Sequence, residues 1–313
     1  MKAPICLFTY NRLNEVLQTL EALQRNFLAP ESELFIFSDG PKNEDDKHKV
    51  NAVRNHIQSV KGFKSVEIIL SDENNGLASS IIHGVSQILE KYENVIVLED
   101  DLITTPNFLN FMNEALNFYQ NDIRIQSVNA YSFYLKNAKS ETYFQIRTGS
   151  WGWATWKNRW NKNIFDKEYI RKIIQSNPSI LSEFKKICGA DVPKMLMDSI
   201  ENKNDSWYIR WVFDHFYNSR YAVFPSRSFI NNIGHSSDAT HCKGIDSYYA
   251  VLVSNTKLDY EFSVFQQLDP ELSREFLNYF SRKHKIIVRI KLLKSRSGRG
   301  ELYREIKVRL GIK

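Results

Sequence analysis

Hydrophobic and polar positions alternate between two patterns along the first hundred residues. Short apolar runs, typical of buried strands, are separated by longer stretches in which apolar residues recur every three or four positions, as on one face of a helix. The pattern predicts strands at 4–9, 33–38, 66–71 and 94–98 and helices at 14–26, 44–60 and 77–92. Repeated strand–helix units build a parallel sheet with right-handed crossovers. We therefore expect residues 1–105 to form a Rossmann-like nucleotide-binding half, although no Gly-x-Gly-x-x-Gly motif supports a dinucleotide cofactor.

After Pro106 the pattern becomes mixed. It predicts helices at 107–120, 167–187 and 205–218, short strands near 124–130, 142–147 and 221–224, and a polar loop at 231–245. No repeat, low-complexity tract or flexible linker is visible before about residue 270. We predict an α/β fold whose mixed, mainly parallel sheet is flanked by helices. One domain, 1–269, would join the first half to an acceptor half, 106–269, and a basic helical extension, 270–313, would follow.

The end of the extension is strongly basic and amphipathic. Residues 282–313 contain twelve Lys and Arg against two Glu, a net charge of +10, which leaves −4 for the other 281 residues of a chain that carries +6. Apolar residues recur there at helical spacing in two pieces, Ile286, Ile290 and Leu293, then Leu302, Ile306 and Leu310. We expect Gly298 and Gly300 to separate these pieces. A basic amphipathic helix favours an anionic membrane surface. A self-packing terminal helix and nucleic-acid binding are the alternatives, and we expect no nucleic acid.

Composition adds limits rather than a function. Hydrophobic residues at 42% and charged residues at 25% are ordinary for a globular protein, and 313 residues can bury a sizeable core. Cys6, Cys188 and Cys242 are too few and too scattered for a disulfide framework, and no Cys/His cluster has the spacing of a zinc site. Neither a signal peptide nor an apolar run of roughly 18 residues is visible. We therefore expect a cytoplasmic protein, peripheral at the inner face of the membrane.

Three consecutive carboxylates follow the apolar strand 94–98. Glu99, Asp100 and Asp101, called here the acidic triplet, come at the end of a strand where ligands of open α/β sheets bind. Adjacent negative charges repel one another unless a cation compensates them, and Mg²⁺ or Mn²⁺ prefers oxygen ligands. The triplet therefore indicates a metal and diphosphate site. An acidic loop or the start of a helix is the alternative.

Polar residues follow two other predicted strands and precede the helix before the acidic triplet. Arg12 could reach a phosphate, and Asp39 could accept hydrogen bonds from a nucleobase or a ribose. Gly76 permits close approach of the backbone. Ordinary helix ends and turns explain each of these segments equally well. The candidate donor-binding residues are Thr9, Tyr10, Arg12, Asp39, Asn75, Gly76, Glu99 and Asp100.

These features, in this order, resemble the GT-A class of glycosyltransferases, which use nucleotide-sugar donors. Residues 7–12 resemble the start of glycosyltransferase family 2 enzymes, and the acidic triplet resembles their metal-binding Asp-x-Asp element. The Golgi N-acetylglucosaminyltransferases that initiate complex N-glycans share Glu-Asp-Asp-Leu followed by Pro and aromatic residues, and Arg-Thr before Gly-Trp, here 147–148 and 152–153. The strongest likeness is to bacterial polysaccharide glycosyltransferases with Trp-Gly-Trp-Ala-Thr-Trp, here 151–156.

The resemblance implies roles for the donor side. Asp101 would ligate Mn²⁺ or Mg²⁺, and Glu99 and Asp100 would hold the sugar or the ribose of the donor. Asp39 would contact the base, which the resemblance suggests is uracil, so that the donor would be a UDP-sugar. His241, in the polar loop that closes over the donor in the resembled enzymes, is a further candidate metal ligand.

The acceptor side is less well defined. An inverting transfer needs a base for the acceptor hydroxyl. The resembled Golgi enzymes place it in Asp-Asp-Trp, matched here by Asp205-Ser206-Trp207. Asp205 could instead cap the following helix, and Asp214 is the rival base. Trp151, Gly152 and Trp153 are the candidate acceptor-binding residues, with the ring of Trp151 stacking on a sugar. The helical spacing of Trp153, Trp156 and Trp160 indicates packing.

The sequence thus predicts a metal-dependent, inverting glycosyltransferase, a hexosyl- or N-acetylhexosaminyltransferase acting on a glycan or a lipid-linked saccharide. A sugar nucleotidyltransferase is one alternative, but the Gly-rich loop that it needs after the first strand is missing. A non-catalytic carbohydrate- or nucleic-acid-binding protein on the same fold is the other.

Overall fold

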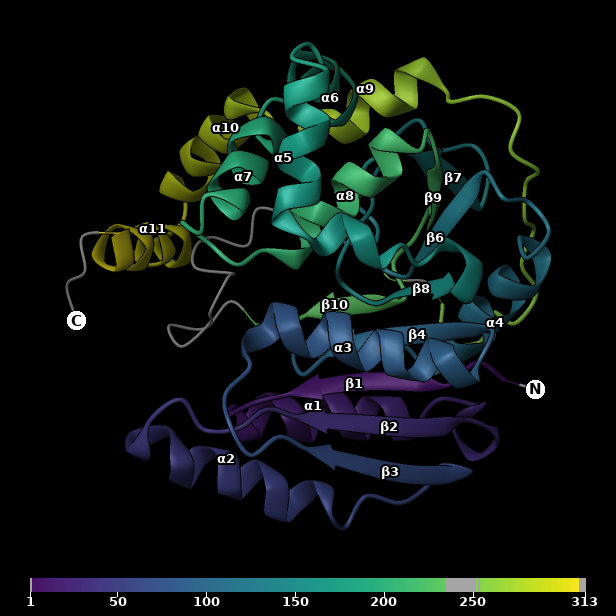
Figure 1. Ribbon diagram of the computed structural model, residues 1–313, viewed down its shortest axis with the longest axis vertical. Helices are drawn as coiled ribbons and strands as arrows, with labels where there is room; N and C mark the ends of the chain where they lie inside the picture. The colour runs from purple at the N-terminus through teal and green to yellow at the C-terminus, as the bar shows by residue number, and fades with distance from the viewer. Residues whose placement is uncertain (1, 235–251, 253, 310–313) are drawn as a thin grey trace.

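The structure of the protein is a computed structural model that describes residues 2–234, 252 and 254–309. Within these residues an eight-stranded sheet has the order β3-β2-β1-β4-β8-β6-β9-β7, and β10 pairs with β5 in a second, two-stranded sheet. Helices cover both faces of the large sheet (Figure 1). The predicted mixed, mainly parallel sheet flanked by helices is confirmed.

The first half is a series of strand–helix units close to the predicted bounds. Its elements are β1 (Ile5–Thr9), α1 (Leu13–Gln24), β2 (Glu33–Ser38), α2 (Glu44–Ile57), β3 (Ser65–Leu70), α3 (Gly76–Lys91) and β4 (Asn94–Glu99). β1 pairs in parallel with β2 and with β4, and β2 pairs in parallel with β3. The carboxyl ends of these strands therefore meet at one edge of the sheet.

The second half adds antiparallel strands. Its elements are β5 (Leu102–Thr104), α4 (Phe108–Phe118), β6 (Ile125–Asn129), β7 (Thr142–Gln145), β8 (Trp153–Trp156), α5 (Lys167–Ser176), α6 (Ile180–Cys188), α7 (Val192–Ile200), α8 (Trp207–Tyr217), β9 (Tyr221–Pro225) and β10 (Ile230–Asn232). β8 runs antiparallel to both β4 and β6, which joins the two halves into one sheet.

The alternation of side chains along the central strands separates two apolar cores. Ile5 and Leu7 of β1 face the core that α1, α2 and α4 cover, whereas Cys6 and Phe8 face the core that α3 and α8 cover. Because successive residues of a strand point to opposite faces, a strand buried on both faces reads as a continuous apolar run.

Two sequence predictions for the second half are wrong in detail. The helix expected at 167–187 is two helices, α5 and α6, because Pro178 cannot continue a helix and restricts Asn177 before it. Trp153 and Trp156 do not share a helix face. They lie in strand β8, where Trp153 points into one core and Trp156 into the other.

The C-terminal extension folds into α9 (Pro270–Asn278), α10 (Arg282–Leu293) and α11 (Arg296–Arg309). The break between α10 and α11 lies at residues 294–295, not at the two glycines, which are both inside α11. A Cβ on Gly298 would lie 2.3 Å from the Leu292 carbonyl oxygen, so this glycine allows α11 to fold closely against the end of α10. Among the described residues, no helix combines the length and apolar character that a membrane span requires.

Candidate active site

A cavity of about 400 Å³ opens at the carboxyl ends of β1, β2 and β4. The structure brings most of the predicted donor-side residues into it, together with Asp205 of the second half: Thr9, Tyr10, Arg12, Asp39, Gly76, Glu99, Asp100 and Asp101. The cavity also has lining residues that the sequence did not single out, among them Phe37, Lys42, Asp46 and Ser80. Parallel strands that end at one edge explain this convergence.

Arg12 compensates part of the negative charge of the acidic triplet. Its Nη2 donates to an oxygen of Asp100 and, at 2.8 Å, to Oδ2 of Asp101. All three side chains are largely buried. Burial raises the pKa of Asp100 to about 6 although Arg12 opposes this shift. Burial and the neighbouring charges of Asp101 and Asp100 hold the pKa of Glu99 well above its usual range. One guanidinium therefore does not fully balance three carboxylates.

The backbone of the acidic triplet is fixed by two elements from distant parts of the chain. Thr19 of α1 donates its hydroxyl to the Asp100 carbonyl oxygen at 2.9 Å, and the Ile233 amide donates to the Asp101 carbonyl oxygen at 2.9 Å. A Cβ on Gly234 would lie 1.9 Å from Oδ2 of Asp101, so the chain after β10 passes directly over this carboxylate. The polar loop that follows, including His241, lies outside the described residues.

Asp39 holds the loop that precedes α3. Its Oδ1 accepts from the amides of Gly40 and Asn75, and its Oδ2 accepts from the amide of Gly76 and the side chain of Asn74, all at 2.9–3.0 Å. Gly76 has a φ of 75°, a conformation that glycine adopts without strain. The carboxylate of Asp39 therefore fixes the shape of this wall of the cavity.

The first turn of α2 is anchored over the cavity. The Tyr10 hydroxyl donates to Oδ2 of Asp46 at 3.0 Å, and the Asn11 side chain donates to Oδ1 at 3.0 Å. Burial is the main cause that raises the pKa of Tyr10 to about 12. Thr9, at the end of β1, donates to the Phe37 carbonyl oxygen at 3.3 Å. Nothing in the sequence pairs Asp46 with Tyr10 and Asn11, because the contact depends on how α2 packs.

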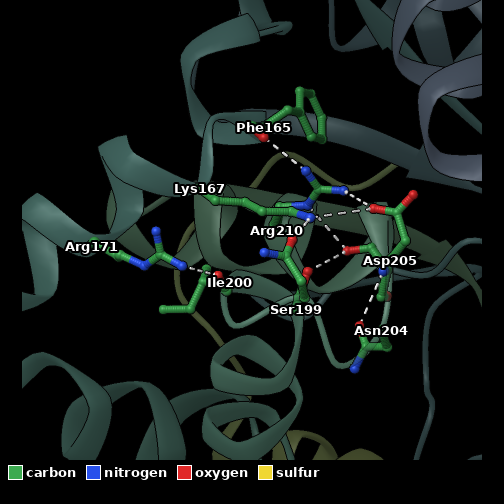
Figure 2. A network of polar contacts seen from close by, with 10 residues as sticks. Phe165, Lys167, Arg171, Ser199, Ile200, Asn204, Asp205 and Arg210 are labelled. Atoms are coloured by element: carbon green, nitrogen blue, oxygen red, sulfur yellow. Dashed lines mark hydrogen bonds and ion pairs between the residues drawn. The ribbon is translucent and has the colours of Figure 1, made fainter.

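Asp205 lies at the start of α8 and lines the cavity with a side chain that is 55% exposed. Figure 2 shows its carboxylate beside the guanidinium of Arg210, at 3.2 Å, and the ammonium of Lys167, at 3.8 Å. Arg210 is held in turn by the Phe165 carbonyl oxygen at 2.7 Å. The helix is capped by Ser206, whose hydroxyl oxygen accepts from the Ile209 amide, so Asp205 is not the cap.

Asp214, the rival base, is completely buried and does not line the cavity. Its carboxylate accepts from the side-chain amides of Gln126, Asn161 and Asn218. Burial raises its pKa to about 6. The next residue, His215, is also completely buried. Its Nε2 shares a hydrogen bond with the Ser127 hydroxyl at 2.8 Å, and its Nδ1 lies 2.9 Å from the Trp211 carbonyl oxygen. These groups form a polar cluster inside the fold.

The aromatic segment 151–153 divides between surface and core. Trp151 is half-buried and its ring meets that of Tyr131 edge to face, with centroids 4.6 Å apart. Trp153 is 1% exposed and packs among Trp160, Trp207 and Trp211, so its ring is not available to an acceptor. Gly152 has a φ of 63°, and a Cβ there would lie 2.1 Å from Ile230 Cδ1.

The acidic triplet suits a divalent cation. Carboxylate oxygens are hard ligands, and the guanidinium that bridges Asp100 and Asp101 shows that a positive charge is accommodated between them. Within the described part of the chain, no three His, Cys, Asp or Glu side chains form a metal-binding group. Mg²⁺ commonly takes only one or two carboxylates together with substrate phosphates and water. The residues therefore fit an ion that binds with a diphosphate.

Comparison with known families decides the class of this protein. The model of Glycosyl transferase family 2 matches residues 5–183, which is more than half of the chain. The chain belongs to glycosyltransferase family 2. The matched region contains β1, the acidic triplet and the segment 151–156, and family membership makes glycosyl transfer its class of activity.

Two solved structures have a weak similarity to this chain. The mannosyltransferase PcManGT from Pyrobaculum calidifontis, in complex with GDP-Man and Mn²⁺, has 11% identity and a TM-score of 0.34, over 50% of this chain and 45% of that one. TarS from S. aureus has 12% identity and a TM-score of 0.41, over 75% of this chain and 37% of that one. The chain thus spans less than half the length of either protein. We found no match among curated proteins.

Proposed function

We propose that this family 2 enzyme is a metal-dependent, inverting glycosyltransferase that moves a hexosyl or N-acetylhexosaminyl group from a UDP-sugar to a glycan or lipid-linked saccharide. One observation carries the proposal. A single cavity is lined by the acidic triplet and Arg12, by the loop that Asp39 holds, and by Asp205, whose carboxylate is exposed. Such a cavity supplies a cation site, a shaped pocket for a nucleotide and a candidate base.

The donor side follows from the contacts. We place the diphosphate beside the acidic triplet, where Arg12 can turn from the carboxylates to a phosphate. Asp39 shapes the wall for the base, and Glu99 or Asp100 accepts from hydroxyls of the sugar or ribose. Mn²⁺ or Mg²⁺, held by Asp101, would neutralise negative charge on the departing diphosphate. His241 remains a proposed further ligand.

In the proposed transfer step, Asp205 takes the proton of the acceptor hydroxyl group. The acceptor hydroxyl oxygen forms a bond to the anomeric carbon while the bond from that carbon to the diphosphate oxygen breaks. The hydroxyl proton passes to the Asp205 carboxylate, and UDP leaves with the electron pair. Lys167 and Arg210 hold this carboxylate in place at the cavity wall. Trp151 and Gly152 are the proposed acceptor contacts.

We propose that the enzyme acts in bacterial polysaccharide biosynthesis and meets its acceptor at the inner face of an anionic membrane. The basic segment 282–313 supports this placement, because clustered Lys and Arg attract anionic lipids.

Calorimetric binding of UDP, GDP, CDP and dTDP, each with Mn²⁺ and with a chelator, tests the proposal. We expect UDP to bind in the presence of Mn²⁺, binding to fall at least about tenfold with the chelator, and Asp101→Ala to lose the metal-dependent part. Asp122→Ala is the control, since Asp122 does not line the cavity. Preference for another nucleotide would overturn the UDP assignment. Equal binding with and without metal would overturn the metal assignment, and no nucleotide binding would overturn the donor site.

A further inference from the structure

Helix α10 exposes a row of aliphatic side chains. Ile286, Ile290 and Leu293 are 57%, 52% and 55% exposed. Residues at this spacing lie on one face of a helix. Val288, in contrast, is buried at 8% exposure and lies two residues, about 200°, around the helix from Ile286. The helix therefore packs on one side, and the aliphatic row points away from the body.

Cations surround this row. Among the side chains that the structure describes in α10, α11 and the turn between them, the exposed cations are Arg282, Lys283, Lys291, Lys294, Arg296 and Arg299. Exposed apolar residues continue into α11 with Tyr303 and Ile306. The whole segment 282–313 carries +10 while the rest of the chain carries −4. The surface formed by α10 and α11, called here the hairpin, is therefore both apolar and cationic.

The hairpin lies on the side of the molecule to which the site opens. In Figure 1, β1 runs from the N-terminus on the right to its carboxyl end on the left, and α10 and α11 lie on the left as well. The cavity is at the carboxyl ends of β1, β2 and β4. A surface that the hairpin contacts would therefore lie on the same side as the cavity.

We propose that α10 and α11 dock the enzyme on an anionic lipid bilayer, with α10 lying in the plane of the interface. Ile286, Ile290 and Leu293 would enter the boundary between head groups and acyl chains, and the flanking Lys and Arg would contact the anionic head groups. The hairpin does not span the bilayer, in keeping with the absence of a sufficiently long apolar helix among the described residues.

Charge and chemistry favour a bilayer over the other occupants. A second copy of the chain would bring another +10 segment against this one, which like-charge repulsion opposes. A nucleic acid would match the cations, but it offers no apolar layer for a continuous aliphatic row. An anionic bilayer satisfies both parts of the surface.

Vesicle sedimentation of the full-length chain tests the proposal. We expect binding to phosphatidylcholine vesicles that contain about one third phosphatidylglycerol, and little binding to phosphatidylcholine alone. Raising the salt concentration from about 0.1 M to about 1 M should weaken binding, because exposed charges are screened. The double variant Ile286→Ser/Ile290→Ser should bind at least about tenfold less tightly, as should Lys283→Glu/Lys291→Glu.

Ile123→Ser is the matched control, because Ile123 is 48% exposed but lies in the body between α4 and β6. It should bind vesicles like the unchanged chain, and circular dichroism should show that all variants are folded. The proposal is overturned if anionic vesicles are not bound, if the aliphatic-row variant binds as tightly as the control, or if polyuridylate or duplex DNA is bound more tightly than vesicles. Because no turnover is measured, failure here leaves the proposed sugar transfer intact and overturns only the placement of its acceptor at a membrane. The further step, that the bilayer also carries the acceptor, rests on the proposed function.

Discussion

At the scale of single residues, the surroundings of each carboxylate decide its role. Asp39 accepts from one donor of its own loop and from three donors of the loop before α3, and Asp100 and Asp101 share Arg12. Asp205 is the half-exposed carboxylate at the wall of the cavity, whereas Asp214, nine residues later, is completely buried. The same chemical group thus holds a loop at Asp39 and lies in a buried polar cluster at Asp214, and in the proposed mechanism it would bind a cation at Asp101 and take a proton at Asp205.

Replacing Asp205 and Asp214 separately distinguishes the two candidate bases. Asp205→Asn should lower kcat by about 10²–10⁴ while UDP binding is retained, because the amide cannot accept the acceptor proton. Asp214→Asn should leave kcat within about twofold, since this side chain does not line the cavity. Both kcat values are measured as the rate of UDP release from the UDP-sugar that a donor screen identifies. The reverse pattern would make Asp214 the base.

The buried carboxylate of Asp214 predicts a pH-dependent stability. Burial raises its pKa to about 6 from an ordinary value of 3.8. Between these values the folded chain keeps a proton that the unfolded chain has released, so the free energy of unfolding falls as pH rises from about 4 to about 6. Asp214→Asn cannot titrate and should lack this fall, about 2–3 kcal/mol. Urea unfolding of both proteins at several pH values measures it, and a constant difference between them would contradict the prediction.

At the scale of elements, the site is an edge where several strand-to-helix loops meet. The loop after β1 supplies Arg12, the loop after β2 supplies Asp39, and the last residue of β4 and the turn after it supply the acidic triplet. Each loop is held by another one: Asp39 binds the amides of residues 75–76, and Arg12 binds the triplet. The shape of the cavity therefore depends on contacts between loops more than on any one element.

The close approach of two of these loops can be tested at Gly40. A Cβ there would lie 2.5 Å from the backbone of Glu73, so Gly40→Ala should push the segment 73–76 away from Asp39. We expect UDP affinity to fall at least about tenfold and stability by about 1–3 kcal/mol. Gly300→Ala, with open space around its Cβ, is the control and should leave UDP binding unchanged. Unchanged affinity in Gly40→Ala would show that the cavity does not need this packing.

At the scale of the whole molecule, the C-terminal extension is not uniform. α9 inserts Leu272 and Phe276 into a core with Tyr143 and Phe224, whereas α10 and α11 leave most of their apolar residues exposed. The division at residue 270 was predicted from composition and charge. The packing shows that the first helix of the extension is continuous with the core of the body.

Replacing Phe276 tests this continuity. Phe276 is 1% exposed, and its ring centroid lies 5.3 Å from that of Phe224. Phe276→Ala should lower the free energy of unfolding by about 3–5 kcal/mol in denaturant titrations, whereas Phe27→Ala, at 51% exposure, should change it by less than about 0.5 kcal/mol. Equal small effects would mean that the extension is stabilised apart from the body.

Much of the fold and part of the site could be predicted from local pattern. The apolar run before Glu99 fixes a buried strand, and polar residues after parallel strands must share an edge, so the meeting of Arg12, Asp39 and the acidic triplet could be foreseen. The position of Asp46 at the site could not be predicted, because its contacts with Tyr10 and Asn11 depend on how α2 packs. The order β4-β8-β6-β9 likewise depends on pairings between segments far apart in sequence, antiparallel for β8 with β4 and β6 and parallel for β6 with β9.

Neighbouring residues are enough to specify the strand–helix alternation, the acidic triplet at a strand end and the concentration of positive charge after residue 282, because each of these features is local in the sequence. The tertiary structure alone decided which candidates face the cavity. It buried Asp214 and Trp153, left Asp205 exposed beside Lys167 and Arg210, and turned the row of Ile286 outward. The physical reason is that burial and charge pairing depend on contacts between distant segments, which local periodicity does not specify.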